Sequence, residues 1–479
     1  MKPIKGIKII KGLAASAFIA LNLSASAYAL SLRDAVVIAV DSNPEIGQSM
    51  ANREAVEFEL RQALGLYMPR VDLEVSTGIQ RLDNPSRRFS GIQDDPLYPT
   101  QVDVVVSHDI WDGGFRRAEA NRQAARVDGA SFRVLERSEF IGLEVSREYF
   151  QVLLQQRVVN IARQNVAFHE QTRNDVRAAV ENGQLTAAES QQVEERLSQA
   201  RARLTEAREA LDLAQIGFYK LVYVPFEAGQ MPSRISRSFM PNSLSQAISQ
   251  ARANNPRLLM ASADIDAAAA VVEQSRSGLN PKINLQGRAS AGYDVNGVDG
   301  ATNDLQVKLS LKWNLYDGGI KRAEIQENAR RETEVALGQQ QVLREVEEAV
   351  RISWTRMGRQ GSLSAQYGSQ LKASSDLVES YRSQFSVNQR SLLDVLDAQN
   401  TRFNVQVLYE TAQYSQRFAE YRLLAATGRL LEYLGLDAPS QSNAYARKKL
   451  NTPSADSYQP RVLEPVNFEE PIDLTSFVN

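Results

Sequence analysis

The 479-residue sequence contains no cysteine and only two histidines, His108 and His169. Without cysteine the chain cannot form disulfides, thiolate metal sites or a lipid-modified N-terminal cysteine. The histidines are far apart in sequence, and no nucleophile motif, phosphate-binding loop or zinc-ligand spacing accompanies them. We therefore expect no enzyme activity, no metal site and no cofactor.

Long apolar runs are also absent once the start of the chain is set aside, so the sequence offers no transmembrane helix after residue 29. Residues 1–29 have the features of a secretory signal: an apolar stretch over residues 13–23, a small-residue cleavage site ending at Ala29, and four early lysines, Lys2, Lys5, Lys8 and Lys11. Removing these four lysines, with no acidic residue among them, changes the net charge from −2 to −6. A mildly acidic mature chain gives no reason to expect a nucleic-acid partner.

What the sequence does contain is a tandem duplication. The stretch WDGGFRRAE at residues 111–119 returns as YDGGIKRAE at residues 316–324, an offset of 205. The openings of the two halves, residues 31–44 and 243–256, match at an offset of 212, so the first half has seven additional residues between its strands. We predict a first repeat at 30–222, a linker at 223–241, a second repeat at 242–436 and a disordered tail at 437–479.

The two D-G-G turns join strand-like stretches to long runs of helix formers. Paired glycines permit a sharp turn that other residues resist, and the preceding aspartate can cap the first free N–H groups of a helix. The residues concerned are Asp112, Gly113 and Gly114 in the first half and Asp317, Gly318 and Gly319 in the second. Each half is thus expected to contain two helices, two strands and two long helices, in that order.

Two β-hairpins, at about 70–111 and 282–316, are predicted from alternating apolar and polar residues. Strands of about ten residues are long enough to cross a bilayer when tilted. Trp111, Trp313 and Tyr316 lie near strand ends, where a membrane interface favours aromatic residues. The alternative is a soluble hairpin with one packed face.

The long helical hairpins, at 114–222 and 319–434, account for most of the mass. Val145, Val152, Val159 and Val166 recur every seven residues, as do Ala398, Val405, Ala412 and Ala419. This spacing is typical of a coiled-coil seam, and alanines in such a seam allow close helix packing. Periodicity of this kind alone is typical of a structural rod.

Each long hairpin turns at a short tip. The tip residues are Asn182, Gly183 and Gln184 in the first hairpin, and Val387, Asn388 and Gln389 in the second. The helices that follow begin with capping-box spacing, Thr186 with Glu189 and Ser391 with Asp394. Asp394 and Asp397 lie three residues apart and share one helix face. The simpler interpretation is that Asp394 stabilises a helix start, but this explains Asp397 less well.

Taken together, these motifs resemble those of the TolC-like outer-membrane efflux and secretion channels. The resemblance covers residues 31–436 and includes the S-L-x-x-A…N-P openings, the paired D-G-G turns, and the stretches LDVLDAQ at 393–399 and YRLLAATG at 421–428. It implies a mostly α fold with membrane β-strands, in which three chains form a twelve-stranded outer-membrane β-barrel and a long periplasmic α-helical barrel. The implied partners are outer-membrane lipid, a periplasmic adaptor and an inner-membrane ABC or RND-type transporter.

The resemblance also implies roles for individual residues. The entrance aspartates of the family fall on Asp394 and Asp397, an arginine of its closing network falls on Arg390, and an aromatic partner falls on Phe385. Phe385 and Glu189 stand where the family prototype has tyrosine and aspartate. The tips would form the adaptor-docking surface.

The resemblance therefore implies a passive exit duct for drug efflux or type I protein secretion. The competing class is a soluble periplasmic coiled-coil adaptor or structural protein, which would not need four amphipathic strands.

Overall fold

The computed structural model describes residues 30–226, 229–297 and 299–454; the predicted signal peptide and the last part of the tail lie outside these residues. The elements of the first half are α1 (Leu32–Ser42), α2 (Pro44–Gly65), β1 (Arg70–Thr77), α3 (Pro85–Phe89), β2 (Thr100–Trp111), α4 (Phe115–Glu181) and α5 (Ala187–Val222). Those of the second are α6 (Leu244–Asn254), α7 (Pro256–Ser277), β3 (Lys282–Tyr293), the 3-10 turn η1 (Val295–Gly297), β4 (Ala301–Lys312), α8 (Ile320–Ser386) and α9 (Leu392–Ala426). A short α10 (Leu430–Leu434) and the 3-10 turn η2 (Ser440–Ser442) follow.

The predicted order of two helices, two strands and two long helices is therefore present in both halves. α3 lies between the two strands of the first predicted hairpin. It begins there because the side-chain oxygen of Asn84 accepts a 2.9 Å hydrogen bond from the Arg87 N–H, and Pro85 suits the first turn of a helix.

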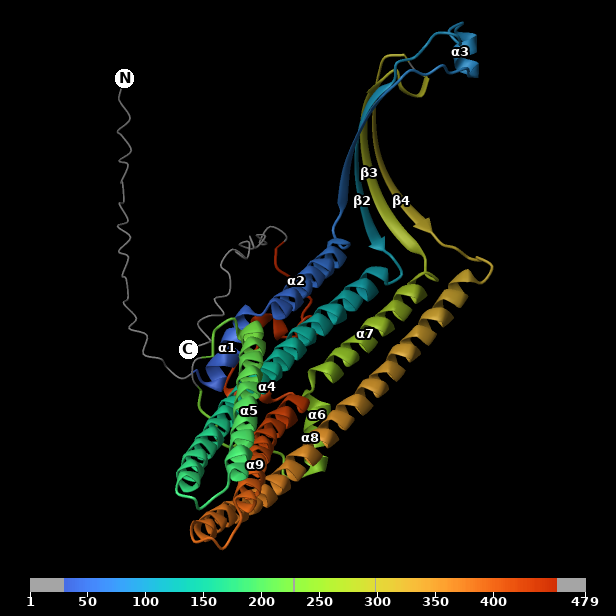
Figure 1. The fold of residues 1–479 in the computed structure, drawn as a ribbon. Helices are drawn as coiled ribbons and strands as arrows, with labels where there is room; N and C mark the ends of the chain where they lie inside the picture. Colours follow the sequence, from blue (N-terminus) through green and yellow to red (C-terminus); the bar gives the residue numbers. More distant parts are fainter. Residues whose placement is uncertain (1–29, 227–228, 298, 455–479) are drawn as a thin grey trace, which may run out of the picture.

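The molecule is elongated, with the sheet at one end and the tips of the helical hairpins at the other (Figure 1). Its four strands are antiparallel in the order β1-β2-β3-β4. Within the chain each outer strand, β1 and β4, pairs with a neighbour on one side only. The sheet thus has two open edges, which in water invite pairing with another strand.

The apolar face of this sheet is uncovered in the single chain. Leu73 pairs with Val104, Val104 with Ala289, and Ala289 with Leu305, so these four side chains share a face. Leu73 is 69% exposed and Leu305 is 83% exposed. The predicted alternation is correct. A soluble hairpin would require its apolar side to be packed. In this chain the apolar side is not packed against any described element.

The last strand is shorter than expected, because β4 ends at Lys312 rather than near Tyr316. The indole N–H of Trp313 donates a 3.0 Å hydrogen bond to the carbonyl oxygen of Leu279, which follows α7. The chain leaves the strand ladder at this contact and enters the second D-G-G turn.

Both D-G-G turns have the predicted capping geometry. The carboxylate of Asp112 accepts hydrogen bonds from the N–H groups of Gly114 (3.0 Å) and Arg116 (2.8 Å). Asp317 accepts the equivalent two bonds in the second half, at 3.0 and 2.9 Å. Both glycines of each turn have positive φ angles. At Gly113 a Cβ would also lie 2.6 Å from the Ser277 carbonyl oxygen, so this turn requires glycine for its conformation and for its packing.

α4 and α8 are each 67 residues long and run from the sheet toward the tips. The residues of the predicted seams are buried, among them Val145, Val152, Val159 and Val166 on α4 and Ala398, Val405, Ala412 and Ala419 on α9. α8 has few buried side chains along its length. This helix therefore presents a large surface that the rest of the single chain does not cover.

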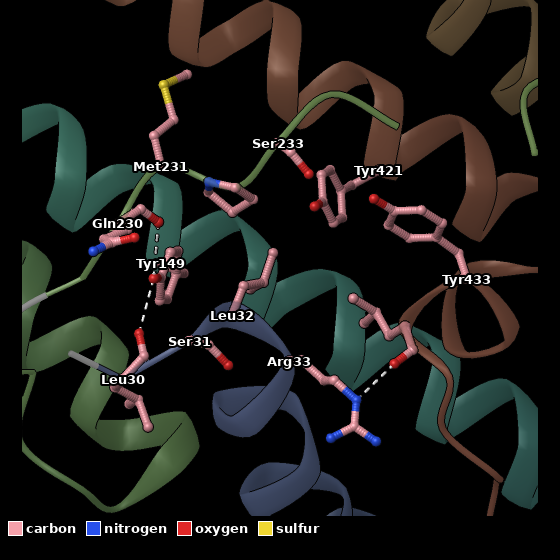
Figure 2. Close-up of a pocket in the computed structure, with 12 residues that line it drawn as sticks. Leu30, Ser31, Leu32, Arg33, Tyr149, Gln230, Met231, Ser233, Tyr421 and Tyr433 are labelled. Atoms are coloured by element: carbon pink, nitrogen blue, oxygen red, sulfur yellow. Dashed lines mark hydrogen bonds between the residues drawn. The ribbon is translucent and has the colours of Figure 1, made fainter. Parts of the chain in front are cut away.

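The two halves meet at the middle of the helical body. The hydroxyl of Tyr149 on α4 lies 2.9 Å from the carbonyl oxygen of Leu30 and 3.1 Å from that of Gln230, joining the start of the described chain to the linker (Figure 2). These residues, with Tyr421 and Tyr433, line a cavity of about 720 Å³. The described part of the linker is packed rather than extended, since Phe226 and Ile235 are buried.

The tail differs from the expectation of disorder as far as residue 454. Ala446 is fully buried against α2 and α4. Its N–H donates a 2.8 Å hydrogen bond to Asp128, and Arg447 forms salt bridges with Asp128 on α4 and Asp266 on α7. A few specific contacts hold this segment although its composition is polar. Residues 455–479 lie outside the described part of the chain.

Among the described residues, no helix combines the length and apolar character that crossing a membrane requires.

Candidate functional site at the helical tips

The two tips turn in the same way. The N–H of Gln184 donates to the carbonyl oxygen of Ala179 at 2.8 Å, and the N–H of Gly183 donates to Val180 at 3.0 Å. The second tip repeats this pattern from Gln389 and Asn388, at 2.9 and 3.0 Å. This is the Schellman ending of a helix, which needs one residue in the left-handed conformation. Gly183 has φ 73° and Asn388 has φ 60°, as expected for these residue types.

Capping groups hold the start of the next helix at each tip. Glu189 accepts a 2.7 Å hydrogen bond from the Thr186 N–H and completes a capping box at the start of α5. Ser391 accepts a 3.2 Å hydrogen bond from the Asp394 N–H, and its hydroxyl donates to the Asp394 carboxylate at 2.8 Å. The capping box gives Glu189 a structural role, and the hydrogen bonds with Ser391 give Asp394 one as well.

Arg390, just before the second of these helices, has three neighbours within its own chain. Its guanidinium lies 4.4 Å above the centre of the Tyr381 ring and 3.8 Å from the Asp394 carboxylate. Its Nε also donates a 3.1 Å hydrogen bond to the side chain of Gln384. The aromatic partner of Arg390 is therefore Tyr381, one helical turn before Phe385.

Phe385, the aromatic partner implied by the resemblance, lies in the apolar packing between the two hairpins of this chain. It packs in a cluster of apolar side chains from α4, α5 and α9, which contains Val176, Val193, Leu392 and Leu396. The side chain of Phe385 thus fastens the second tip to the first hairpin. In this chain it makes no contact with Arg390 like that of Tyr381.

Asp397 is paired across the two hairpins. Its carboxylate lies 3.2 Å from the Arg196 guanidinium on α5. Farther along α5, Arg203 donates hydrogen bonds to Asn400 (2.9 Å) and Asn404 (3.2 Å) on α9. No sequence signal pointed to Arg196 or Arg203, because nothing in the spacing of α5 indicates which of its faces meets α9.

A buried polar pair lies in the same region. The Gln399 side-chain amide on α9 donates a 2.8 Å hydrogen bond to the side-chain oxygen of Asn165 on α4, and both side chains are buried. One turn away, His169 is 4% exposed. Burial, reinforced by the positive charges of Arg196 and Arg203, lowers the pKa of His169 to about 4. The ring is therefore neutral at neutral pH.

These observations place the predicted entrance residues Arg390, Asp394 and Asp397 in one charged region at the start of α9. Asp394 and Asp397 remain half-exposed, with 42% and 59% of their side chains accessible. The described residues contain no group of three or more His, Asp or Glu side chains arranged to hold a metal ion. The arrangement suits electrostatic control of passage rather than covalent chemistry.

A sheet with an uncovered apolar face at one end, and long helical hairpins with charged tips at the other, defines the subunit of an elongated membrane-anchored channel. The family model described as outer membrane efflux protein matches residues 36–222 and 247–429. The chain therefore belongs to the outer membrane efflux protein family.

Individual proteins agree with this assignment. The chain is 23% identical to the outer membrane efflux protein BepC of Brucella suis, over 85% of this chain and 87% of BepC. It is 25% identical to the alkaline protease secretion protein AprF of Pseudomonas aeruginosa, over 87% of this chain and 86% of AprF. A crystal structure of a membrane protein from Pseudomonas aeruginosa has the same fold, with a TM-score of 0.74 at 18% identity, covering 83% of this chain and 90% of that one.

Membership of the family gives the general function. The chain is an outer-membrane channel protein with a large periplasmic helical portion, and not an enzyme. The alternative of a soluble adaptor or structural rod is thereby set aside.

Proposed function

We propose that three copies of this chain form one channel, with a twelve-stranded β-barrel in the outer membrane continued by an α-helical tunnel in the periplasm. The observation that carries the proposal is the four-stranded sheet, which has one exposed apolar face and two open edges. Four strands are too few to close a barrel around side chains, whereas twelve lie within the range of membrane barrels. Closure joins β1 of one chain to β4 of the next and places the apolar face against lipid.

The channel serves as a passive exit duct for drug efflux or type I protein secretion. It works with a periplasmic adaptor and an inner-membrane transporter of the ABC or RND type. Support for both uses comes from the relatives, since BepC is named for efflux and AprF for secretion of a protease. The exposed tips of the two hairpins are the surface that faces an inner-membrane partner, because they lie farthest from the sheet (Figure 1).

The charged region at the start of α9 forms the entrance. Three chains bring six carboxylates, from Asp394 and Asp397, to one ring. Like charges gathered in a narrow ring favour cations and allow polyvalent cations to block the pore. Arg390 offsets part of this charge and lies between Tyr381 and Asp394.

A pair of arginine substitutions on β4 tests the barrel. Leu309 is 65% exposed on the apolar face, and Leu309→Arg would cost about 2–4 kcal/mol near the middle of a bilayer. Gln306→Arg introduces the same side chain on the polar face of the same strand. We expect trimers of Gln306→Arg, but few or none of Leu309→Arg, in outer-membrane fractions. Equal amounts of both would contradict the proposed barrel.

A further inference from the structure

The polar face of the sheet carries an acidic row near the loops. Glu74 on β1 pairs with Asp103 on β2, Asp103 with Ser290 on β3, and Ser290 with Asp304 on β4. Residues directly opposite each other in a sheet share a face, so three carboxylates lie on one level of it. We call Glu74, Asp103 and Asp304 the acidic belt. Arg288 forms a 2.8 Å salt bridge with Asp103, which leaves a net charge of −2 per chain at this level.

The same face carries lysines near the helices. Lys282 on β3 pairs directly with Lys312 on β4, and Lys308 lies four residues before Lys312 on the same face. We call these three residues the basic belt. Neither Lys308 nor Lys312 forms a salt bridge within the described chain, and both are exposed. Among the described residues of this face, Asp109 accepts a hydrogen bond from Asn284 and is the one acidic side chain near these lysines apart from Asp72, whose charge Arg70 neutralises. Three lysines and Asp109 give this part of the face a net charge of +2 per chain.

Sheet stability does not explain these positions. Like charges directly opposite each other in a sheet are destabilising. The sheet contains two such pairs, Glu74 opposite Asp103 and Lys282 opposite Lys312. Arg288 offsets the first pair, and no described carboxylate forms a salt bridge with either lysine of the second. The second pair therefore opposes folding of the sheet, and sheet stability gives no reason for its presence.

The belts are far enough apart to act separately. Along β4, Asp304 lies four residues from Lys308 and eight residues from Lys312, which corresponds to about 13 Å and about 26 Å at 3.3 Å per residue. A strand tilt of about 40° reduces these separations to about 10 Å and about 20 Å along a barrel axis. The Debye length is about 8 Å at physiological ionic strength, so each belt has its own local field. β3 runs from the end of α7 to the loop between the strands (Figure 1). Because Lys282 begins β3 and Ser290 lies near its other end, the basic belt is nearer the helices and the acidic belt is nearer the loops.

We propose that, in the trimer, the two belts make the barrel interior bipolar, and that the unpaired charges of Glu74, Asp304, Lys308 and Lys312 determine its ion specificity. This inference rests on the proposed trimeric barrel, which brings each belt together three times. The acidic belt admits cations from the outer side and the basic belt admits anions from the periplasmic side. Current is therefore larger when the outer side is positive, because both ions then enter through the belt that favours them.

Planar-bilayer recording tests this, using channels that carry Asp394→Ala and Asp397→Ala so that entrance carboxylates do not set the selectivity. We expect protein added to one side to insert with the sheet leading, which fixes the orientation. In about 0.15 M salt the Debye length is about 8 Å, shorter than the separation of the belts, and we expect currents at opposite voltages to differ by at least about twofold. In about 1 M salt, where that length is about 3 Å, the ratio should approach one.

Lys308→Gln combined with Lys312→Gln should abolish this asymmetry and make the channel more cation-selective. Glu74→Gln combined with Asp304→Asn should also abolish it and make the channel more anion-selective. Gln306→Asn, on the same face between the belts, is the control and should leave the current unchanged. If a double variant does not assemble, Lys312→Gln alone should reduce the ratio.

Channels whose asymmetry and selectivity are the same in every variant would overturn the bipolar interior and leave the barrel intact. Failure of the starting channel to conduct would count against the proposed function itself.

Discussion

Arg196 on α5 lies 3.2 Å from Asp397 on α9, so a salt bridge joins the first helical hairpin to the second near the tips. Arg382 on α8 and Asp175 on α4 make a second such contact at 3.7 Å, and Arg157 on α4 and Glu410 on α9 a third at 2.9 Å. If the entrance opens by moving the second hairpin away from the first, these pairs must separate. A closed entrance would then depend on these contacts within each chain.

Arg196→Gln is expected to raise channel conductance. Asp397 is 59% exposed, so loss of this pair costs only about 0–1 kcal/mol per chain, but a trimer loses it three times. Arg201→Gln is a matched control on the same helix, because Arg201 pairs with Glu170 inside the first hairpin at 2.8 Å. Bilayer recording should show higher conductance for Arg196→Gln only. The same conductance in both variants would mean that the contact between the hairpins does not hold the entrance closed.

Asp394→Ala combined with Asp397→Ala should lower cation selectivity and remove block by polyvalent cations. The helix start should survive, since Ser391 bonds to the backbone N–H of residue 394 and not only to its carboxylate. Arg390→Ser should raise conductance by weakening the closed tip. Glu189→Ala is the control, because this carboxylate caps α5 and should affect stability rather than selectivity. If the double variant kept the ion selectivity and the block, these aspartates would not line the entrance.

Gly183→Val should abolish export while trimers still form. Gly183 has φ 73°, and the left-handed conformation costs a residue with a Cβ roughly 1–2 kcal/mol. Gly183→Asn is the matched control, since asparagine occupies the equivalent position at Asn388 with φ 60°. Export assays in cells should find Gly183→Asn active and Gly183→Val inactive. Normal export by the valine variant would argue against docking at this tip.

Glu139 should make stability depend on pH in an unusual direction. Burial raises the pKa of this α4 carboxyl from 4.5 to about 7, although it accepts hydrogen bonds from the N–H groups of Leu430 (3.1 Å) and Leu431 (3.3 Å). The folded state thus holds this proton more tightly than the unfolded chain does. Its contribution to stability is complete below pH 4.5 and is lost as the pH rises through about 7.

Thermal unfolding of Glu139→Gln, compared with the unaltered protein from pH 4 to 8, measures this effect. The difference in melting temperature between the two proteins should shift in favour of Glu139→Gln as the pH rises. Tyr149→Phe is the control, because a phenol does not titrate in this range. A difference that is constant with pH would mean that Glu139 does not change its protonation state there.

Periodicity in the sequence was enough to predict most of the fold. The two-residue alternation of the strands, the seven-residue seams of α4 and α9, and the glycines and capping residues of the turns all express local rules, and the structure follows them. The tandem repeat predicted that each element of the first half has an equivalent in the second half. The strand end at Lys312 was missed because it depends on the bond from Trp313 to Leu279, a contact between segments 34 residues apart.

The contacts of the candidate site were only partly predictable. Asp394 and Asp397 could be identified as carboxylates on one helix face, but their partners lie on other parts of the chain. Arg196 reaches Asp397 only because α5 packs beside α9. Similarly, the largely polar composition of the tail gave no indication that Arg447 would bind Asp128. Such pairings depend on tertiary packing and not on local propensity.

Disulfide cross-linking between strand edges tests the trimeric barrel most directly, because the native chain has no cysteine. Leu73→Cys on β1 would be combined in turn with Leu305→Cys, Val307→Cys and Leu309→Cys on β4, all on the apolar face. Within one chain β1 and β4 are three strand spacings apart, about 14 Å, which is too far for a disulfide. We predict that mild oxidation of outer membranes yields covalent dimers and trimers for at least one pair, and nothing larger. Monomers alone for all three pairs, or a series extending beyond three chains, would contradict the account.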